Sequence, residues 1–197
     1  MYSLGIDVGS SSVKVALLDI ASGKCVCSST NPKSEAPIIA EHKGWAEQDP
    51  DSWWGYMCDG LKEMSKSHDL SKIASIGISY QMHGLVALDK DGKPVRNSII
   101  WCDSRAVGVG SEALEGIGYD KCMSHLLNSP GNFTASKLAW VKRNEPEVYS
   151  RIDKFMLPGD YIAYLLTGEE TTTATGLSEG ILWDFKKGSR ADFVADW

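Results

Sequence analysis

The sequence lacks the features of several large classes of protein. No apolar run approaches the length that spans a bilayer, and the first residues, MYSLGIDVGSS, have no basic flank before their short apolar run. We therefore expect neither a membrane span nor a secretory signal. Positive charge is also scarce, with 20 Lys and Arg against 26 Asp and Glu and a net charge of −6. A nucleic acid or an anionic membrane needs a basic surface, so neither is expected as a partner.

Cysteine is present, but not in a pattern that predicts disulfides or a metal site. The chain has five cysteines, an odd number, and no second pair accompanies Cys25 and Cys27 at metal-ligand spacing. Their spacing of two residues would place both side chains on the same face of a strand. We expect reduced thiols, most of them buried, in a cytoplasmic protein. The chain also has no pair of histidines at ligand spacing, so zinc chemistry is not indicated, and serine-hydrolase chemistry is not expected either.

The spacing of apolar residues predicts an α/β fold. Period-two alternation on both sides of GSSS (9–12) predicts a hairpin, and CVCSST (25–30) predicts a third strand. A helix is predicted to begin with Asp49 as N-cap and Pro50 as its first residue. Further strands are expected at 73–79, which we predict to be buried, in a hairpin over 85–95, at 98–101 and at 154–158. Helices are expected near 104–115, 119–127, 134–144, 146–151 and 159–168, and another is expected to follow Ser189 as its cap.

The opening stretch GIDVGSSSVKVALLD (5–19) allows two interpretations. It lacks the glycines of a dinucleotide fingerprint, and GVGSEA (108–113) falls within a predicted helix, so neither is a Rossmann motif. One interpretation is an ordinary hairpin with a small-residue turn. The other is a phosphate-binding turn with N–H and hydroxyl donors, a nearby lysine, and an acid that holds Mg²⁺ through water. The residues of this second interpretation are Asp7, Gly9, Ser10, Ser11, Ser12 and Lys14.

Two further segments carry candidate ligand contacts. YQMHG (80–84) follows a predicted strand, and its Gln81 and His83 offer donors and acceptors suited to a polyol beside the adaptable apolar wall of Met82. The alternative is a structural histidine whose hydrogen bonds are satisfied inside the fold. WCDSR (101–105) has Trp101 and Asp103 as candidates, and the alternative there is a core tryptophan with a helix-capping ion pair.

In this order, the segments resemble the N-terminal domain of the FGGY family of carbohydrate kinases, and among them the xylulokinases. The matching segments span nearly the whole chain: GIDVGSSSVKVALLD, GWAEQDPDSWW, GISYQMHGLVALDKDGKPVRNSIIWCDSR, PGNFTASKLAWVKRNEPEVY and MLPGDYIAYLLTGE. QMHG is the segment that favours xylulokinases over glycerol kinases. The resemblance implies an actin/hexokinase-type (ribonuclease H-like) domain with a mixed sheet that opens with the phosphate hairpin and is flanked by helices.

The resemblance also implies a reaction and its ligands. It implies phosphorylation of a ketopentose such as D-xylulose by ATP, with Mg²⁺, in a family whose full-length members are homodimers. Asp7 would serve Mg²⁺-ATP, and the hairpin turn would bind the ATP phosphates. The implied sugar contacts are Gln81, Met82, His83, Gly84, Trp101, Asp103 and Asn132. A ribulose or glycerol kinase of the same family, or a non-catalytic binding module of the actin and chaperone type, remains the alternative.

The chain departs from the family pattern at two positions and lacks one part of it. Gly159 stands where many relatives carry Lys, and TTTATGLSEG (171–180) stands where relatives carry acidic residues. The catalytic base, an Asp in a Gly-Asp-Gln or Gly-Asp-Asn segment, is expected beyond Trp197, and Asp160 is not assigned that role. We therefore expect residues 1–197 to be a truncated kinase, the sugar-binding domain without its nucleotide-binding partner domain, and to be inactive alone.

Overall fold

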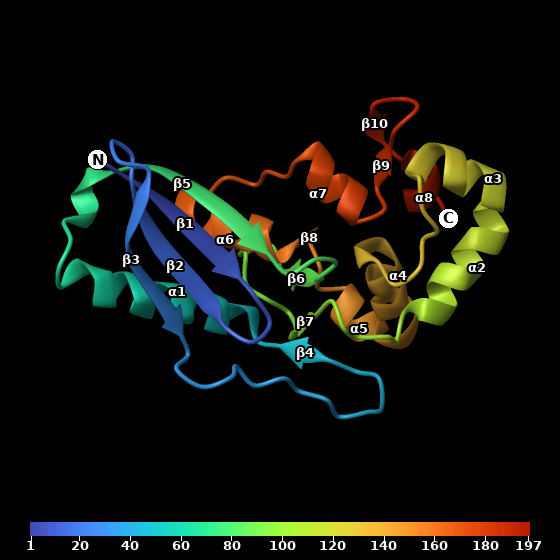
Figure 1. Ribbon diagram of the computed structural model, residues 1–197. Coiled ribbons are helices and arrows are strands. Elements are labelled where there is room, and N and C mark those ends of the chain that lie inside the picture. The colour runs from blue at the N-terminus through green and yellow to red at the C-terminus, as the bar shows by residue number, and fades with distance from the viewer.

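A four-stranded mixed sheet opens the chain in the computed structural model, which describes residues 1–197 (Figure 1). Its strands lie in the order β3-β2-β1-β5. β1 runs antiparallel to β2, β2 runs antiparallel to β3, and β5 runs parallel to β1. Their bounds are β1 Tyr2–Val8, β2 Val13–Asp19, β3 Lys24–Asn31 and β5 Ile73–Tyr80. The predicted hairpin and third strand are confirmed.

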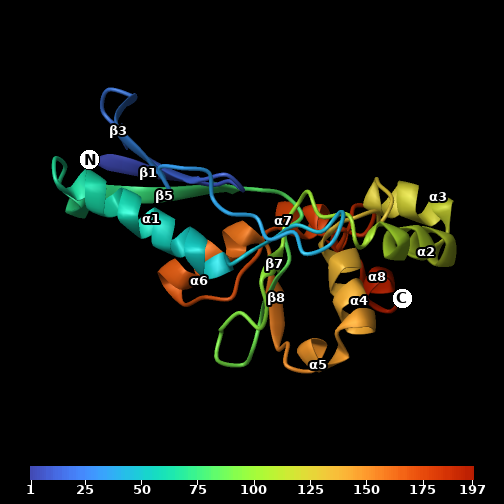
Figure 2. The same ribbon diagram turned by 90° about the horizontal axis from the view of Figure 1, so that it is seen from below.

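The two faces of this sheet differ in what covers them. Leu4, Ile6 and Val8 alternate along β1 and are at most 2% exposed, because α1 (Pro50–Ser65) and α6 (Pro158–Thr167) pack on their face. The other face carries small or polar residues such as Gly5 and Asp7. Figure 2 shows both helices on one side of the sheet and no helix over the other side.

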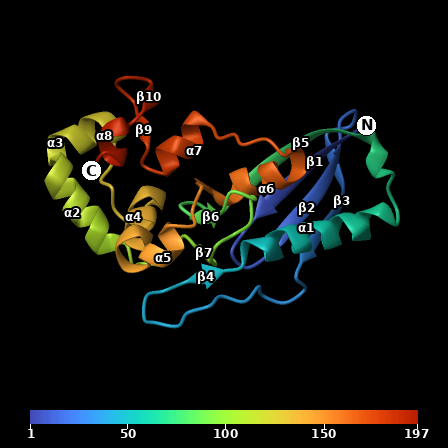
Figure 3. The ribbon, with the colours of Figure 1, turned by 180° about the vertical axis from the view of Figure 1, so that it is seen from behind.

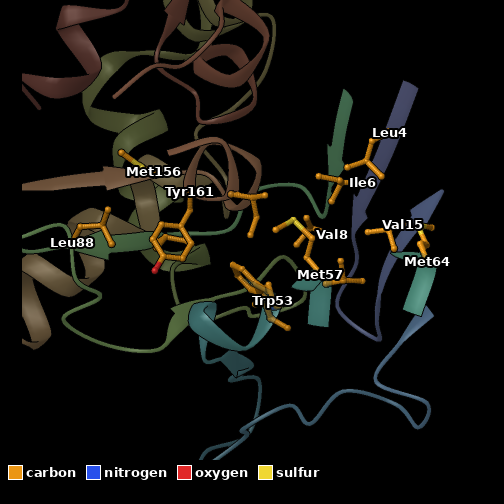
Figure 4. Packing of buried hydrophobic residues seen from close by; sticks show 14 of the residues in the cluster. Leu4, Ile6, Val8, Val15, Trp53, Met57, Met64, Leu88, Met156 and Tyr161 are labelled. Carbon is orange, nitrogen blue, oxygen red and sulfur yellow. The ribbon is translucent and has the colours of Figure 1, made fainter. Parts of the chain in front are cut away.

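The main core lies between α1 and the sheet (Figure 4). Asp49 caps α1, since its carboxylate accepts the N–H of Asp51 at 3.0 Å, and Pro50 is the first helical residue as predicted. Trp53, Met57 and Met64 follow at helical spacing, and each is 1% exposed. Burial of each such side chain stabilises the fold by about 1.5–3 kcal/mol.

Strand β5 is not the buried strand that its apolar residues predict. Most of its residues are exposed, and the side chain of Ile76 is 48% exposed. The reason is its position, because β5 pairs with β1 on one side only and forms an edge of the sheet. Its last residues, Ile78 and Tyr80, still pack against the main core.

Three pairs of short strands lie outside this sheet, two between it and a helical region and the third within that region (Figure 3). These pairs are β4 (Glu47–Gln48) with β7 (Ser98–Ile99), β6 (Val86–Leu88) with β8 (Lys154–Met156), and β9 (Trp183–Asp184) with β10 (Ser189–Arg190). The remaining helices are α2 Val107–Ile117, α3 Tyr119–Lys121, α4 Thr134–Asn144, α5 Pro146–Tyr149, α7 Ala174–Glu179 and α8 Asp192–Ala195, with a 3₁₀ turn at Leu70–Lys72 and a π-helical turn at Cys122–Leu126. The predicted helices therefore exist, with bounds shifted by a few residues. No helix is both long enough and apolar enough to cross a membrane.

One prediction of secondary structure is confirmed as a short hairpin and another needs correction. In the expected hairpin over 85–95, Leu88 bridges to Pro94 in antiparallel fashion and the N–H of Val95 donates to the carbonyl of Ala87 at 2.9 Å, and β6 pairs in addition with β8. Ser189 does not cap a helix, because it lies in β10 and α8 begins at Asp192.

The cysteines also differ from the prediction. All five are free, but only Cys122 is buried. Cys25 and Cys27 lie opposite adjacent residues of β2, with a register shift at Val26 between them. This β-bulge reverses the alternation, so Cys25 is exposed while Cys27 packs against the main core.

Candidate functional site

The turn that joins β1 to β2 presents unpaired hydrogen-bond donors. The N–H of Gly9 donates to the carbonyl of Ser12 at 3.0 Å and closes the turn. The N–H groups of Ser10, Ser11 and Ser12 donate no hydrogen bond within the chain. Three successive free donors, together with serine hydroxyls, are suited to an anion such as a phosphate group.

Beside this turn, Asp7 and Lys14 face each other across β1 and β2 on the open face of the sheet. The hydroxyl of Ser79, at the end of β5, donates to Asp7 Oδ1 at 2.9 Å. These three residues help line a groove of about 570 Å³, together with small residues such as Gly5 and Gly77. No group of three or more His, Cys, Asp or Glu side chains is placed to hold a metal ion. Mg²⁺ at Asp7 would therefore be held largely by water and phosphate oxygens, as it commonly is in kinases.

The loop after β5 begins next to the hairpin turn. Gln81 N–H donates to the carbonyl of Val8 at 2.8 Å, and its side-chain amide donates to Gln48 Oε1 at 3.3 Å. Gln48 in turn donates to the carbonyl of Ser10 at 2.6 Å. Gln48 thus connects the loop to the turn. It lies in the matching segment GWAEQDPDSWW, but sequence reasoning did not assign it to the site.

His83 lies within this loop in a conformation that is rare for a residue with a side chain. Its φ is 59°, in the left-handed region, and its ring packs edge-on against Phe133 with 4.3 Å between ring centroids. Its Nδ1 is buried and has no hydrogen-bond partner. Burial, and then the positive charge of Lys137, lower the pKa of His83. The alternative of a structural histidine with satisfied hydrogen bonds is therefore wrong for Nδ1.

Met82 and Gly84, on either side of His83, differ in exposure. Met82 is 53% exposed, so its side chain is free to contact a ligand. Gly84 is buried, and a Cβ there would lie 2.5 Å from the ring of Pro158 at the start of α6. Glycine at this position therefore allows the loop to lie directly against α6.

Trp101 brings the segment after β7 to the hairpin turn. Its indole Nε1–H donates to the hydroxyl of Ser10 at 3.3 Å, and the side chain is 47% exposed. The alternative interpretation of a core tryptophan is therefore wrong. Through Ser10, two segments 91 residues apart in the sequence come into contact.

Asp103 is held entirely within the fold. It is fully buried, accepts the N–H of Ala46 at 2.6 Å, and pairs with Arg105 Nη2 at 2.7 Å. Arg105 also pairs with Glu47 at 2.7 Å, and its guanidinium stacks on Trp45, 3.7 Å from the ring centroid. The arrangement agrees with the alternative interpretation of an ion pair at this position, and direct contact of Asp103 with a sugar stays a prediction.

Asn132 extends the same cluster from the loop before α4. Its amide donates to the carbonyl of Asp103, while its Oδ1 is buried without a partner. Gln81 Oε1 and His83 Nδ1 are likewise buried and unpaired. Unpaired polar atoms are uncommon inside proteins, and sugar hydroxyls are groups that can satisfy them. We call Gln81, Met82, His83, Gly84, Trp101, Asp103 and Asn132 the loop cluster.

Lys137 in α4 supports the loop cluster and was missed by sequence reasoning. It is fully buried, and its ammonium donates to the carbonyls of His83 at 2.7 Å and Ile100 at 3.0 Å. Burial lowers its pKa from 10.5 to about 8. A signal existed in the sequence, because Lys137 lies at helical spacing from the buried Thr134 and Val141.

Comparison with known proteins supplies the context of this site. Residues 2–197 match the model of the N-terminal domain of the FGGY family of carbohydrate kinases. The xylulose kinase of Escherichia coli (strain K12) is 36% identical over 183 residues, which cover 93% of this chain and 36% of that protein. The chain thus spans about a third of the length of that curated relative.

Solved structures agree with this assignment. A structure described as a xyloylose kinase from Brucella ovis superposes with a TM-score of 0.90 at 31% identity, over 98% of this chain and 40% of that one. Plasmodium falciparum glycerol kinase with ADP superposes with a TM-score of 0.86 at 23% identity, over 99% of this chain and 40% of that one, and shares the fold. The predicted actin/hexokinase-type α/β fold is confirmed.

Proposed function

This chain belongs to the FGGY family of carbohydrate kinases, and we propose that it is the sugar-binding domain of a kinase that phosphorylates a ketopentose. D-Xylulose is the first candidate substrate, because the relative from Escherichia coli is a xylulose kinase. One observation supports the proposal above others. The hydrogen bond from Trp101 to Ser10 brings the loop cluster next to a turn with free N–H donors. A sugar hydroxyl and a phosphate group bound there would lie close together, as phosphoryl transfer requires.

We propose that the loop cluster binds the sugar. The unpaired atoms of Gln81, His83 and Asn132 would pair with hydroxyl groups, and the exposed Met82 and Trp101 would pack on the carbon skeleton. The buried Asp103 would act indirectly. Its carbonyl accepts the side-chain amide of Asn132, and its carboxylate, bound to Ala46 and Arg105, anchors the segment that carries Trp101.

We propose that the hairpin turn and the open sheet face bind Mg²⁺-ATP. The N–H groups of Ser10, Ser11 and Ser12, in the turn that begins at Gly9, would bind phosphate oxygens, and Lys14 would neutralise part of their charge. Asp7, oriented by Ser79, would hold a water ligand of Mg²⁺. When bound, Mg²⁺-ATP supplies the phosphoryl group and neutralises its developing charge.

We propose further that residues 1–197 form one domain of a longer enzyme, and that the base that removes the sugar proton lies outside them. Neither Asp7, which faces the proposed phosphate site, nor Asp103, whose carboxylate is paired, is free for that task. Turnover by this chain alone is therefore expected to be negligible. Dimerisation of the longer enzyme is likewise a proposal, based on the family resemblance.

A second kinase specificity is the main rival. Ribulose and glycerol present similar hydroxyl groups, and part of the enclosing surface would come from outside this chain. A non-catalytic binding module is the more distant rival. It is disfavoured because a module without a sugar ligand has no evident use for three buried, unpaired polar atoms beside an anion-binding turn.

Calorimetric titration of the purified chain with D-xylulose, D-ribulose and glycerol tests the proposal. We expect D-xylulose to bind most tightly, and His83→Ala to weaken its binding about tenfold or more. His68→Ala is the matched control, since His68 packs against Tyr2 at the far end of the sheet. Absence of binding by all three sugars would contradict the sugar-binding assignment. Sugar-stimulated formation of ADP by the chain alone would contradict the assignment of the base to another part of the enzyme.

A further inference from the structure

A carboxylate from a distant part of the chain contacts the backbone of His83. Glu179, the last residue of α7, accepts the N–H of His83 at 2.6 Å, although 96 residues separate them. The same oxygen lies 4.0 Å from His83 Nδ1. Both side chains are largely buried, with 22% of the His83 side chain and 18% of the Glu179 side chain exposed. Neither the QMHG motif nor the rest of the sequence reasoning identified this contact.

The hydrogen bond is made at the strained point of the loop. A left-handed φ at a non-glycine residue costs on the order of 1–3 kcal/mol, and it persists only where surrounding contacts enforce it. At His83 these contacts come from both sides. Lys137 binds the carbonyl of His83 from α4, and Glu179 binds its N–H from α7. The position of the imidazole therefore depends on two side chains of opposite charge.

Tyr80 lies beside the same carboxylate. Burial, and then the negative charges of Glu179 and Asp160, raise the pKa of the Tyr80 phenol, so it stays neutral and able to donate. Its ring fills the space next to Gly159, where a Cβ would lie 2.0 Å from the ring. Tyr80, Glu179 and Gly159 thus lie next to one another beside the loop that carries His83.

We propose that Glu179 is a positioning residue that sets the sugar specificity of this site: its carboxylate, flanked by Tyr80, fixes the left-handed turn at His83 and the orientation of the imidazole toward the sugar. The inference rests on the proposed function, since the ligand is taken to be the sugar bound by the loop cluster. The charged and titratable groups that face Glu179 are His83 from the loop, Tyr80 from β5, Asp160 from α6 and Lys137 from α4.

The test uses the whole chain labelled with ¹⁵N and compares Glu179→Ala, Glu179→Gln and the control Glu169→Gln, which changes an exposed acid. Glutamine keeps an oxygen that accepts the His83 N–H but loses the charge. We expect Glu179→Ala to shift the His83 amide and imidazole resonances and Glu179→Gln to restore the amide resonance. Because the charge that faces Nδ1 is gone, the imidazole of Glu179→Gln is expected to titrate at lower pH than that of the unaltered chain.

Sugar affinity gives the second measurement. We expect Glu179→Ala to weaken binding of D-xylulose about tenfold or more, with Glu179→Gln close to the unaltered chain, and to change the preference among D-xylulose, D-ribulose and glycerol. His83 resonances that are the same in all the variants would overturn the inference. If Glu179→Ala does not fold, an unchanged imidazole titration in Glu179→Gln would overturn it equally. If His83 responds as expected but no sugar binds, the positioning role stands while its role in specificity and the proposed function both fail.

Discussion

The two ends of the candidate site are built in opposite ways. Beside the hairpin turn, Asp7 lies on the open face of the sheet, where it lines a groove of about 570 Å³ together with Lys14 and small residues such as Gly5 and Gly77. The loop cluster instead rests on fully buried charged groups, above all Lys137 and the pair of Asp103 with Arg105. The hairpin turn is held by hydrogen bonds from uncharged side chains such as Gln48 and Trp101, whereas the loop cluster is fixed by buried charged groups from several elements.

This difference indicates which property each end contributes. Buried charged networks hold side chains and loops in a single arrangement, and removal of one member leaves its partners unpaired. The loop cluster is therefore held in one arrangement without a ligand, as the proposed sugar site would require. The open face can be altered at little cost to the fold, so its residues are expected to affect binding much more than stability.

The largest effect is expected from Arg105→Ala. Arg105 is 1% exposed and pairs with Asp103 and Glu47, so its removal leaves the buried Asp103 without its ion-pair partner and leaves Glu47 with Arg96 alone. We expect the free energy of unfolding to fall by about 3–5 kcal/mol, measured by urea denaturation, and sugar binding to be lost with it.

Arg143→Ala is the matched control for this change. Arg143 pairs with Glu112, but its side chain is 42% exposed and that of Glu112 is 62% exposed. Exposed pairs contribute about 0–1 kcal/mol, so this variant is expected to unfold close to the unaltered chain. Equal losses in the two variants would show that the network beneath the loop cluster has no special role.

The second effect concerns the pH dependence of stability. Burial lowers the pKa of Lys137 from 10.5 to about 8. Below pH 8 the folded and unfolded chains both carry this proton, and between pH 8 and 10.5 only the unfolded chain keeps it. Lys137 therefore makes the free energy of unfolding rise with pH over this interval, by up to about 3 kcal/mol.

This contribution is measured by urea denaturation at several pH values. It is the difference between the plot of unfolding free energy against pH for the unaltered chain and the same plot for Lys137→Met. Lys142→Met, which changes an exposed lysine of the same helix, should retain the rise. A curve for Lys137→Met that runs parallel to that of the unaltered chain would contradict the prediction.

The third effect tests how tightly α6 packs against Tyr80, at the end of β5 beside the loop cluster. In Gly159→Ala the new Cβ would lie 2.0 Å from the ring of Tyr80, and we expect a loss of about 1–3 kcal/mol in the free energy of unfolding. Gly55→Ala in α1 is the control, since nothing lies within 4 Å of its Cβ, and it should stabilise the chain by up to about 1 kcal/mol. In a background that already carries Tyr80→Ala, Gly159→Ala should cost much less free energy of unfolding, because the clashing ring is gone. An undiminished cost in that background would show that the strain comes from another contact.

Local sequence patterns predicted some features of the fold and not others. The hairpin and the start of α1 depend on local signals, namely alternation around residues 9–12 and the pair Asp49–Pro50, and both predictions are confirmed. The pairing of β6 with β8 depends on a contact between segments more than 60 residues apart, so no local pattern contains it. The same is true of the exposure of β5, which depends on which strands flank it.

The candidate site divides in the same way. QMHG and WCDSR indicated a polar site because they contain groups that bind polyols, and Ser10 does contact Trp101. Lys137 and Glu179 were missed because a charged residue in a helix is normally solvated, and only the tertiary fold buries these two against His83. Motifs therefore indicated the candidate ligand contacts, while the burial of the residues that hold them became evident in the tertiary fold.

The smallest effect on stability is expected at the open end. Asp7→Asn keeps an oxygen that accepts the hydroxyl of Ser79, and the residue is only half-buried, so the free energy of unfolding should change by less than about 0.5 kcal/mol. Loss of the carboxylate charge should nevertheless weaken Mg²⁺-dependent binding of ATP about tenfold or more, measured by calorimetric titration with and without Mg²⁺. D-Xylulose affinity should stay unchanged, because the loop cluster is held by other residues. Asp7→Asn is compared directly with Arg105→Ala in the same urea denaturation. Equal losses in the free energy of unfolding would mean that both ends of the candidate site are integral to the core, and the contrast between the fixed loop cluster and the open sheet face would be wrong.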